Sequence, residues 1–192
     1  MQNTNLILSL IKLSNYRNIN KITEGIEEKD NLLQICHFSR LCLYSIEELG
    51  DLSEQQKLLD NGYVLMLLIL LGIDDYSDVR QDIQINQGLI HIIGLIQGLR
   101  QGKKSYDIKI QGQSFPPQKA LVKTCMEQIE EEGGNEEIES QLINKGRNKG
   151  FDYLLDYNRW DGRIINNALS AKEEILNLYK NRSIEGLFWN YQ

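Results

Sequence analysis

Three cysteines and two histidines are the residues of this sequence best suited to metal binding or nucleophilic chemistry. Cys36, His37 and Cys42 lie close together, whereas His91 and Cys125 lie far along the chain. Because Cys36 and His37 are adjacent, they point about 100° apart on a helix and are poorly placed to bind one ion. Three cysteines at these spacings fit no zinc pattern, and an odd number excludes a complete set of internal disulfides. We therefore predict no metal, no cofactor and no catalytic residues, and we expect reduced thiols in a cytosolic-type compartment.

Two groups of carboxylates are the other candidates for chemistry. Asp74, Asp75 and Asp78 lie in a polar segment that lacks the glycine and the closing glutamate of an EF-hand loop, so we expect a solvated turn with a helix cap. The second group surrounds Gly133 and is either a docking site for a basic partner or, more commonly, a solvated corner between helices. Its members are Glu127, Glu130, Glu131, Glu132, Glu136, Glu137 and Glu139.

Charge and hydropathy exclude two classes of partner. The chain has 192 residues, a net charge of −6 and an isoelectric point near 5.1, which argues against nucleic acid and against anionic membrane surfaces. The longest apolar run covers residues 63–73, whereas a membrane-spanning helix needs about 20 apolar residues. The N-terminal apolar stretch, residues 6–13, is interrupted by Lys12 and follows no basic segment, so it does not resemble a secretory signal. We expect no nucleic-acid partner and no direct membrane insertion.

The pattern of apolar residues predicts an all-α chain with a single domain over residues 1–192. The only prolines are Pro116 and Pro117, so long stretches contain nothing that forbids a helix. Glycines after apolar turns mark helix ends, and Ser53 is a candidate N-cap. In the helix 32–49, we expect Leu32, Ile35, Cys36, Leu43 and Ile46 to form the buried face. The predicted helices are 32–49, 54–61, 63–71, 79–99, 117–131, 136–145, 150–157 and 163–180, with a loop at 103–118, a short extended piece at 106–110 and a turn at 158–162.

An internal repeat is the most informative feature of the sequence. Residues 57–62 (KLLDNG) and 141–146 (QLINKG) share the pattern polar, Leu, aliphatic, Asp or Asn, polar, Gly. The offset is 146 − 62 = 84 residues, and half of 84 is 42, within the range of roughly 40–47 residues of HEAT and armadillo repeats. The same offset relates the apolar helices, the polar turns and the long helices that follow them.

The order of elements resembles the armadillo repeat, whose unit has a short first helix, an apolar second helix and a long third helix. The clearest units are 53–102 and 136–182; residues 103–134 resemble an irregular unit and residues 5–50 a partial N-terminal one. The resemblance covers roughly residues 30–182, and HEAT-type helix pairs would show a similar pattern. It implies a right-handed α-solenoid of about three to four armadillo-like repeats, in which the third helices line a concave surface that binds proteins.

The resemblance also implies where a partner would bind. In the nuclear-import receptors of this family, the third helices present a recurring Trp and Asn pair that grips basic peptides. Here Asn166 and Asn167 lie on the last long helix and Trp160 precedes it, but no array forms, so a nuclear-import receptor is not expected. The implied groove-lining residues are His37, Arg40, Tyr44, Gln84, Gln87, His91 and Asn167.

Two further features have alternative interpretations. Gly94 and Gly98 are four residues apart on one helix face, where either a neighbouring repeat packs tightly or another chain approaches closely. The aromatic tail either covers the open edge of the last repeat or inserts into a neighbouring protein, because Trp and Tyr are favoured interface anchors. Its candidate contacts are Phe188, Trp189 and Tyr191.

Three functions follow as hypotheses. The first is a non-catalytic protein-binding scaffold or adaptor, a structural subunit of a larger cytoplasmic complex, with a cytoskeletal or ciliary assembly as one setting. The second is a helical accessory subunit of a membrane-bound or organellar assembly, for example a mitochondrial one. The third is an enzyme with cysteine or carboxylate chemistry, which a single hyper-reactive thiol among Cys36, Cys42 and Cys125 would support.

Overall fold

The structure, a computed structural model, describes residues 3–15, 26–72, 79–103, 114–147 and 160–188. These residues form helices and one isolated β-bridge, and they contain no strand, so the prediction of an all-helical chain is confirmed for this part of it. The helices are α1 (Asn3–Ser14), α3 (Ile26–Leu49), α4 (Leu52–Asp60), α5 (Tyr63–Leu71), α6 (Val79–Gln101), α7 (Lys119–Glu131), α8 (Gly134–Arg147) and α9 (Trp160–Phe188).

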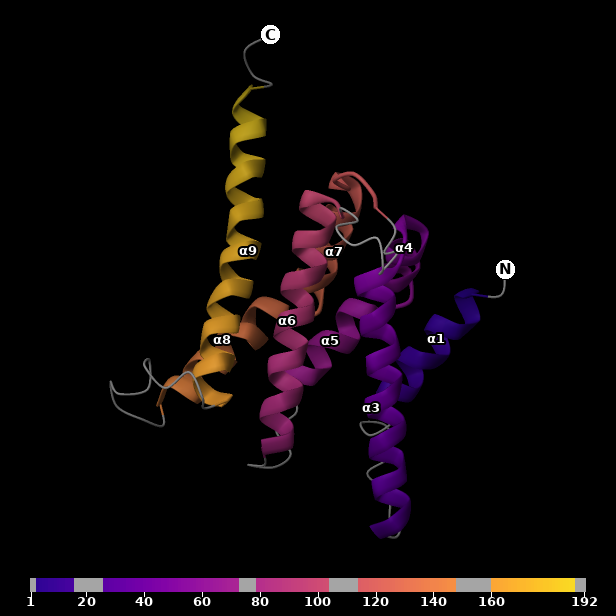
Figure 1. Cartoon of the computed structure of the whole chain (residues 1–192). Coiled ribbons are helices and arrows are strands. Elements are labelled where there is room, and N and C mark those ends of the chain that lie inside the picture. Colours follow the sequence, from indigo (N-terminus) through magenta and orange to yellow (C-terminus); the bar gives the residue numbers. More distant parts are fainter. Residues whose placement is uncertain (1–2, 16–25, 73–78, 104–113, 148–159, 189–192) are drawn as a thin grey trace.

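The three longest helices, α3, α6 and α9, stand side by side in chain order (Figure 1). Contacts between α6 and α9 run in the same direction along both helices. Asn167 donates a 2.8 Å hydrogen bond to Asn86 near their N-terminal ends, and Arg100 forms a 2.8 Å ion pair with Glu174 further along. The two helices are therefore parallel, and α3 continues the row on the other side of α6 through Tyr44, which stacks on His91.

The short helix α5 lies at the centre of the core and contacts α4, α6, α7 and α8. Its sequence, YVLMLLILL, is apolar on every side, which is typical of a fully buried helix. On α6, Gly88 allows close approach to α5, because a Cβ atom there would lie 3.1 Å from the carbonyl oxygen of Leu67. Buried apolar side chains from all eight described helices belong to one hydrophobic cluster. The described helices thus share one core.

Three glutamines each join two helices by capping the C-terminal turn of a helix that lies earlier in the chain. Gln55 donates to the carbonyl of Glu47 at the end of α3 (2.8 Å), and Gln128 to that of Leu59 at the end of α4 (3.1 Å). Gln141 donates to the carbonyl of Leu71, the last residue of α5 (2.8 Å). The last four carbonyls of a helix lack partners within it, and each glutamine supplies a hydrogen-bond donor to one of these groups. The polar residues of this chain therefore contribute to helix packing as well as to the surface.

A two-residue bridge closes the connection between α6 and α7. The backbone amides of Lys103 and Phe115 each donate to the other residue's carbonyl, at 2.9 and 3.0 Å. Gly102, which precedes the bridge, has a φ of +76° and lies against the backbone of Phe115 and Pro116. The extended piece predicted at 106–110 lies outside the described residues.

Several predicted helix boundaries were wrong for local reasons. The N-cap of α4 is Asp51 rather than Ser53, since the Asp51 side chain and Glu54 form a reciprocal capping box. Helix α8 ends at Arg147, one residue beyond the predicted stop at Gly146. Trp160 and Gly162, predicted in a turn, belong to α9. The predicted helix 150–157 lies outside the described residues.

The local conformation therefore differs at the two glycines that the 84-residue repeat aligns. Gly62 forms a corner between α4 and α5 with a φ of +85°, as predicted, whereas Gly146 is the last residue but one of α8. A self-match in sequence therefore does not impose the same backbone conformation at both places. The described helices establish an all-α fold, and the finer repeat assignment stays a proposal.

Candidate functional site

Helix α3 buries two charged residues, Arg40 and Glu47, and exposes a row of apolar residues. Arg40 and Glu47 are buried, with 4% and 6% of their surface exposed, whereas Phe38 is 59% exposed. We define the outer face of α3 as the exposed positions that recur at helical spacing, and none of these has a charged side chain. They are Gln34, Ile35, Phe38, Leu41, Cys42, Ser45 and Leu49.

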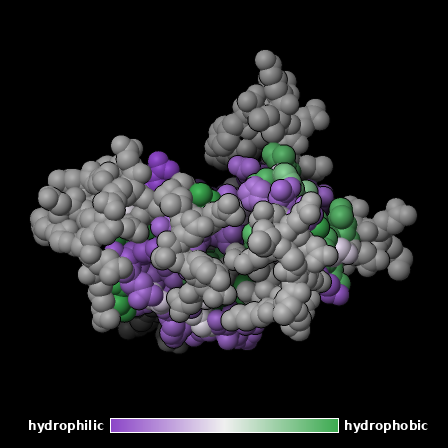
Figure 2. Space-filling model, turned by 90° about the horizontal axis from the view of Figure 1, so that it is seen from below, coloured by the Kyte–Doolittle hydropathy of each residue, from purple (hydrophilic) through white to green (hydrophobic). Residues whose placement is uncertain are grey.

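This distribution is unusual for a solvent-facing helix, whose exposed positions are normally rich in charge. Single exposed apolar residues are common, whereas four large ones on one uncharged face make that face a candidate interaction surface. Seen from below, hydrophobic atoms reach the surface on the side where α1 and α3 stand in Figure 1 (Figure 2). The outer face of α3 is therefore the first candidate for contact with another molecule.

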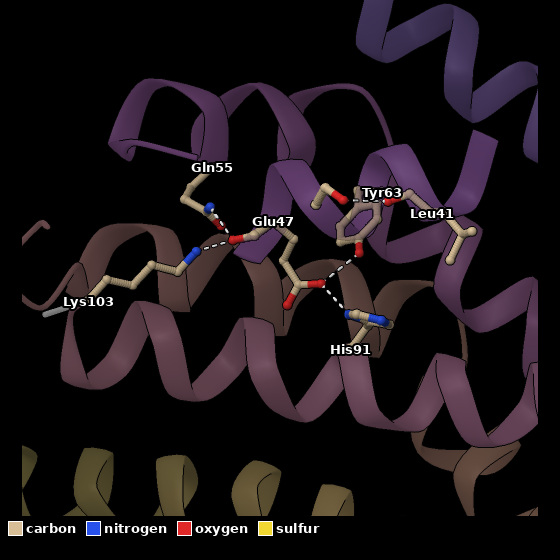
Figure 3. A network of polar contacts seen from close by, with 7 residues as sticks. Leu41, Glu47, Gln55, Tyr63, His91 and Lys103 are labelled. Carbon is tan, nitrogen blue, oxygen red and sulfur yellow. Dashed lines mark hydrogen bonds and ion pairs between the residues drawn. The ribbon is translucent and has the colours of Figure 1, made fainter. Parts of the chain in front are cut away.

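The buried side of α3 organises a polar cluster around Glu47, which we call the Glu47 cluster. One carboxylate oxygen of Glu47 accepts a hydrogen bond from the Tyr63 hydroxyl at 2.7 Å and lies 2.7 Å from Nδ1 of His91 (Figure 3). Tyr63 comes from α5 and His91 from α6, so one carboxylate connects three helices. A buried carboxylate requires such partners, because its transfer from water is otherwise very costly.

Tyr44 and Gly94 complete the Glu47 cluster. The rings of Tyr44 and His91 are stacked, with centroids 3.6 Å apart and planes 12° from parallel. Gly94 leaves room for the other carboxylate oxygen of Glu47, since a Cβ atom at this position would lie only 3.1 Å from it. Gly94 therefore serves close packing within this chain, which is the first of the two interpretations of the α6 glycines.

The backbone of Glu47 has two side-chain partners at the end of α3. Its carbonyl accepts hydrogen bonds from Gln55 and from the ammonium group of Lys103 (Figure 3). A cation is favourable at a helix C-terminus, where the helix dipole is negative. Burial lowers the pKa of Lys103, an effect that the nearby carboxylates of Glu47, Glu48 and Glu54 oppose. Lys103 thus ties the loop after α6 to α3.

Burial also controls the acidity of the groups near Glu47. It raises the pKa of Tyr44 to about 12 and that of Cys125 to about 12, and it raises the pKa of Tyr63 well above its usual range. The negative charge of Glu47 acts in the same direction on all three groups. At neutral pH these side chains are protonated, so neither phenol serves as a base and Cys125 is not present as a thiolate.

We expect these raised values to produce alkaline destabilisation. The folded-state pKa of Tyr44, about 12, lies above the ordinary value of 10.0, so its contribution to stability is complete below about pH 10 and is lost as the pH rises through about 12. Denaturant unfolding across this range should show falling stability, and Tyr44→Phe should reduce the slope. Ultraviolet titration of wild type, Tyr44→Phe and Tyr63→Phe supplies the check: each substitution should remove a late transition, and the loss of an early transition instead would contradict the raised pKa values.

The structure brings together some of the predicted groove residues and separates others. Tyr44 and His91 touch, and Arg40 influences the pKa of Tyr44 from the same buried face. Gln84 and Gln87 are half-buried on α6. Asn167 is engaged in the contact between α6 and α9.

The remaining predicted contacts are His37 on α3 and the three aromatic residues at the C-terminal end. His37 is exposed on α3 and its ring lies beside that of Phe38, with centroids 5.6 Å apart. Phe188 is the last residue of α9, and its side chain lies outside the description. Trp189 and Tyr191 lie outside the described residues.

The sequence did not predict the outer face of α3 or the central role of Glu47. Ile35 was assigned to the buried face, but it is 45% exposed. A usable indication was present: Phe38, Leu41 and Leu49 lie outside the predicted buried stripe and form a second apolar stripe on the same helix. Two apolar stripes on one helix indicate either complete burial or an additional partner.

Comparisons with protein-family models, curated proteins and solved structures found no match to this chain. Within the described residues, no helix is both long and apolar enough to cross a membrane. In the same part of the chain, no three residues of the metal-binding types His, Cys, Asp and Glu are grouped so that they could hold an ion.

Proposed function

We propose that this protein is a non-catalytic protein-binding subunit that docks through the outer face of α3. The observation that carries this proposal is the reversed distribution on α3, with Arg40 and Glu47 buried and Phe38 exposed. Placing Glu47 inside requires hydrogen-bonding partners from two other helices, while Phe38 outside leaves apolar surface in water. Covering such surface with a partner contributes about 25 cal/mol for each Å² removed from water, before the costs of association.

The arrangement of the long helices supports an armadillo-like solenoid as the architecture. Three long helices stand in a row, and each of α6 and α9 follows shorter helices in the chain, as in the repeat unit. Repeat stacks have open ends that need a cap or a partner. In this proposal α3 is the last long helix of the row, α1 packs against it, and its outer face is the surface left for a partner.

The proposed setting is a cytoplasmic assembly, in which this chain is a fixed structural subunit. All three cysteines are free, and Cys42 is exposed. Exposed free thiols fit a reducing compartment better than an oxidising one. A cytoskeletal or ciliary assembly is one such setting.

An enzymatic role has less support from the geometry. The Glu47–His91 pair has the short contact of a carboxylate that orients a catalytic histidine. However, the ring of His91 is stacked on Tyr44, and the Tyr63 hydroxyl already donates a hydrogen bond to Glu47. These contacts favour a structural role for the pair.

Native cross-linking with mass spectrometry tests the proposed function. Wild type and Phe38→Glu are compared in their native cellular setting, with Leu169→Glu as a matched control because Leu169 is also exposed, at 51%, but lies on α9. We expect cross-links from α3 to another protein chain in wild type and in the control, and their loss in Phe38→Glu. Cross-links unaffected by Phe38→Glu would contradict docking through α3.

A further inference from the structure

His91 is the only side chain that can carry a charge along the middle of α6. From Ile83 to Leu99 the sequence has no Asp, Glu, Lys or Arg, and no other titratable residue. The ring of His91 stacks on Tyr44, and its Nδ1 atom lies 2.7 Å from a carboxylate oxygen of Glu47. An imidazole nitrogen is either a hydrogen-bond donor or an acceptor, depending on where the ring carries its proton.

The partner of Nδ1 determines where the proton of a neutral His91 ring lies. The same oxygen of Glu47 that faces Nδ1 also accepts a hydrogen bond from the Tyr63 hydroxyl. An ionised carboxylate accepts hydrogen bonds and cannot donate one, so Nδ1 must supply the hydrogen of its short contact with Glu47. A neutral imidazole has one such hydrogen, and Nε2 is therefore left with a free electron pair.

The second ring nitrogen of His91 reaches the surface. Within the part of the chain that the structure describes, Nε2 forms no hydrogen bond and is not buried. The side chain keeps 20% of its surface exposed. The two ring nitrogens point in different directions, so Nε2 is directed away from Glu47 (Figure 3). Gly94, about one turn further along α6, is also exposed and has no side chain that could cover the ring.

We infer that Glu47 holds His91 in the tautomer with hydrogen on Nδ1, so that Nε2 is an exposed hydrogen-bond acceptor. The chemical group that it fits is a donor, such as a hydroxyl or an amide N–H of a molecule bound over α6. In the opposite tautomer the same atom would be a donor and would fit an acceptor instead. Glu47 is thus a positioning residue, which acts through His91 and does not itself touch the bound molecule.

This acceptor is separate from the outer face of α3. His91 belongs to α6, and it meets α3 at the buried residues Tyr44 and Glu47, whereas the proposed docking surface carries Phe38 on the exposed side. The inference therefore does not depend on docking through α3. A wrong tautomer would leave the proposed function unaffected, and cross-links unaffected by Phe38→Glu would leave the tautomer unaffected.

Nitrogen NMR of the purified full chain with isotope-labelled histidine reads the tautomer directly. The chain has only two histidines, so the variant His37→Gln identifies the signals of His91. The spectra are recorded above the ordinary titration range of histidine, where the ring is neutral. We expect hydrogen on Nδ1 of His91 and none on Nε2. Hydrogen on Nε2 alone, or on both nitrogens, overturns the inference.

Two substitutions test whether Glu47 determines the tautomer. Glu47→Ala removes the acceptor and should shift His91 toward the tautomer with hydrogen on Nε2, whereas Glu48→Ala, at the exposed neighbouring position, should leave the tautomer unchanged. An unchanged tautomer in folded Glu47→Ala overturns the role of Glu47. Circular dichroism establishes that each variant is folded, and the wild-type spectrum decides by itself if Glu47→Ala does not fold.

Acylation with diethyl pyrocarbonate tests whether Nε2 can be reached from solvent. The reagent transfers an ethoxycarbonyl group to an unprotonated imidazole nitrogen and releases ethanol and carbon dioxide. Peptide mapping separates the two histidines, and the exposed His37 is the internal reference. We expect both His37 and His91 to react in the folded chain. A His91 that stays unmodified until the chain is unfolded, while His37 reacts, overturns the exposure of the acceptor.

Discussion

Replacing Glu47 with alanine is expected to lower the free energy of unfolding by about 3 kcal/mol. The substitution removes the acceptor of the Tyr63 hydroxyl, which is fully buried, and the partner of His91. It also leaves a cavity where the carboxylate joined α3 to α5 and α6. Loss of a buried acceptor costs more than the net value of the hydrogen bond, because the donor keeps its desolvation penalty.

Urea unfolding monitored by circular dichroism measures this effect, and the adjacent residue provides the control. Glu48 follows Glu47 in the chain but is exposed, so Glu48→Ala should change the stability by less than about 0.5 kcal/mol. Glu47→Gln keeps one acceptor oxygen, so its loss of stability should lie between those of Glu47→Ala and Glu48→Ala. Equal losses for Glu47→Ala and Glu48→Ala would show that Glu47 does not connect the helices.

Replacing Gly102 with alanine is expected to cost about 3 kcal/mol or to open the base of the loop between α6 and α7. Its φ of +76° disfavours any residue with a Cβ atom, and that atom would lie 2.5 Å from the carbonyl oxygen of Phe115 and 2.8 Å from Pro116 backbone. Backbone atoms cannot move aside as a flexible side chain can. Opening of the loop would also withdraw Lys103 from the end of α3.

Comparison with Gly62→Ala separates the steric clash at Gly102 from the conformational penalty of a positive φ. The φ of Gly62, +85°, is similar, but a Cβ atom there would meet nothing within 4 Å. Gly62→Ala should therefore cost only the conformational penalty of about 1 kcal/mol. Thermal unfolding of both variants measures the difference, and a Gly62→Ala loss as large as that of Gly102→Ala would argue against a clash at the loop base.

Helix positions were the part of the structure most accessible from sequence. The apolar block of α5 and the glycines around it fixed that helix to the residue, because Gly62 and Gly72 flank an uninterrupted apolar run. The N-cap of α4 was misplaced because serine and aspartate compete for the same role, and the reciprocal bond with Glu54 decides for Asp51. Local rules thus locate helices better than their exact ends.

The candidate site was much less accessible from sequence because it depends on contacts between distant residues. Tyr44 and His91 were both expected to matter, but as groove residues rather than as a stacked pair beside Glu47. In the sequence, Glu47 resembles an ordinary surface glutamate. Only the folded structure shows that Tyr63 and His91 contact its carboxylate. The capping glutamines were hidden for a similar reason, because the sequence is rich in Gln and Asn and nothing in it distinguishes these three. Each caps a helix that lies earlier in the chain: Gln55, Gln128 and Gln141.

The central claim is that α3 buries Glu47 and exposes Phe38. Carbodiimide labelling measures the solvent exposure of carboxylates, and radical oxidation measures that of aromatic side chains. Both are carried out on dilute protein. The account predicts that Glu48 is labelled rapidly and Glu47 slowly, and that Phe38 is oxidised readily while Tyr63 is protected. Equal labelling of Glu47 and Glu48, together with protection of Phe38 in the monomer, would contradict it.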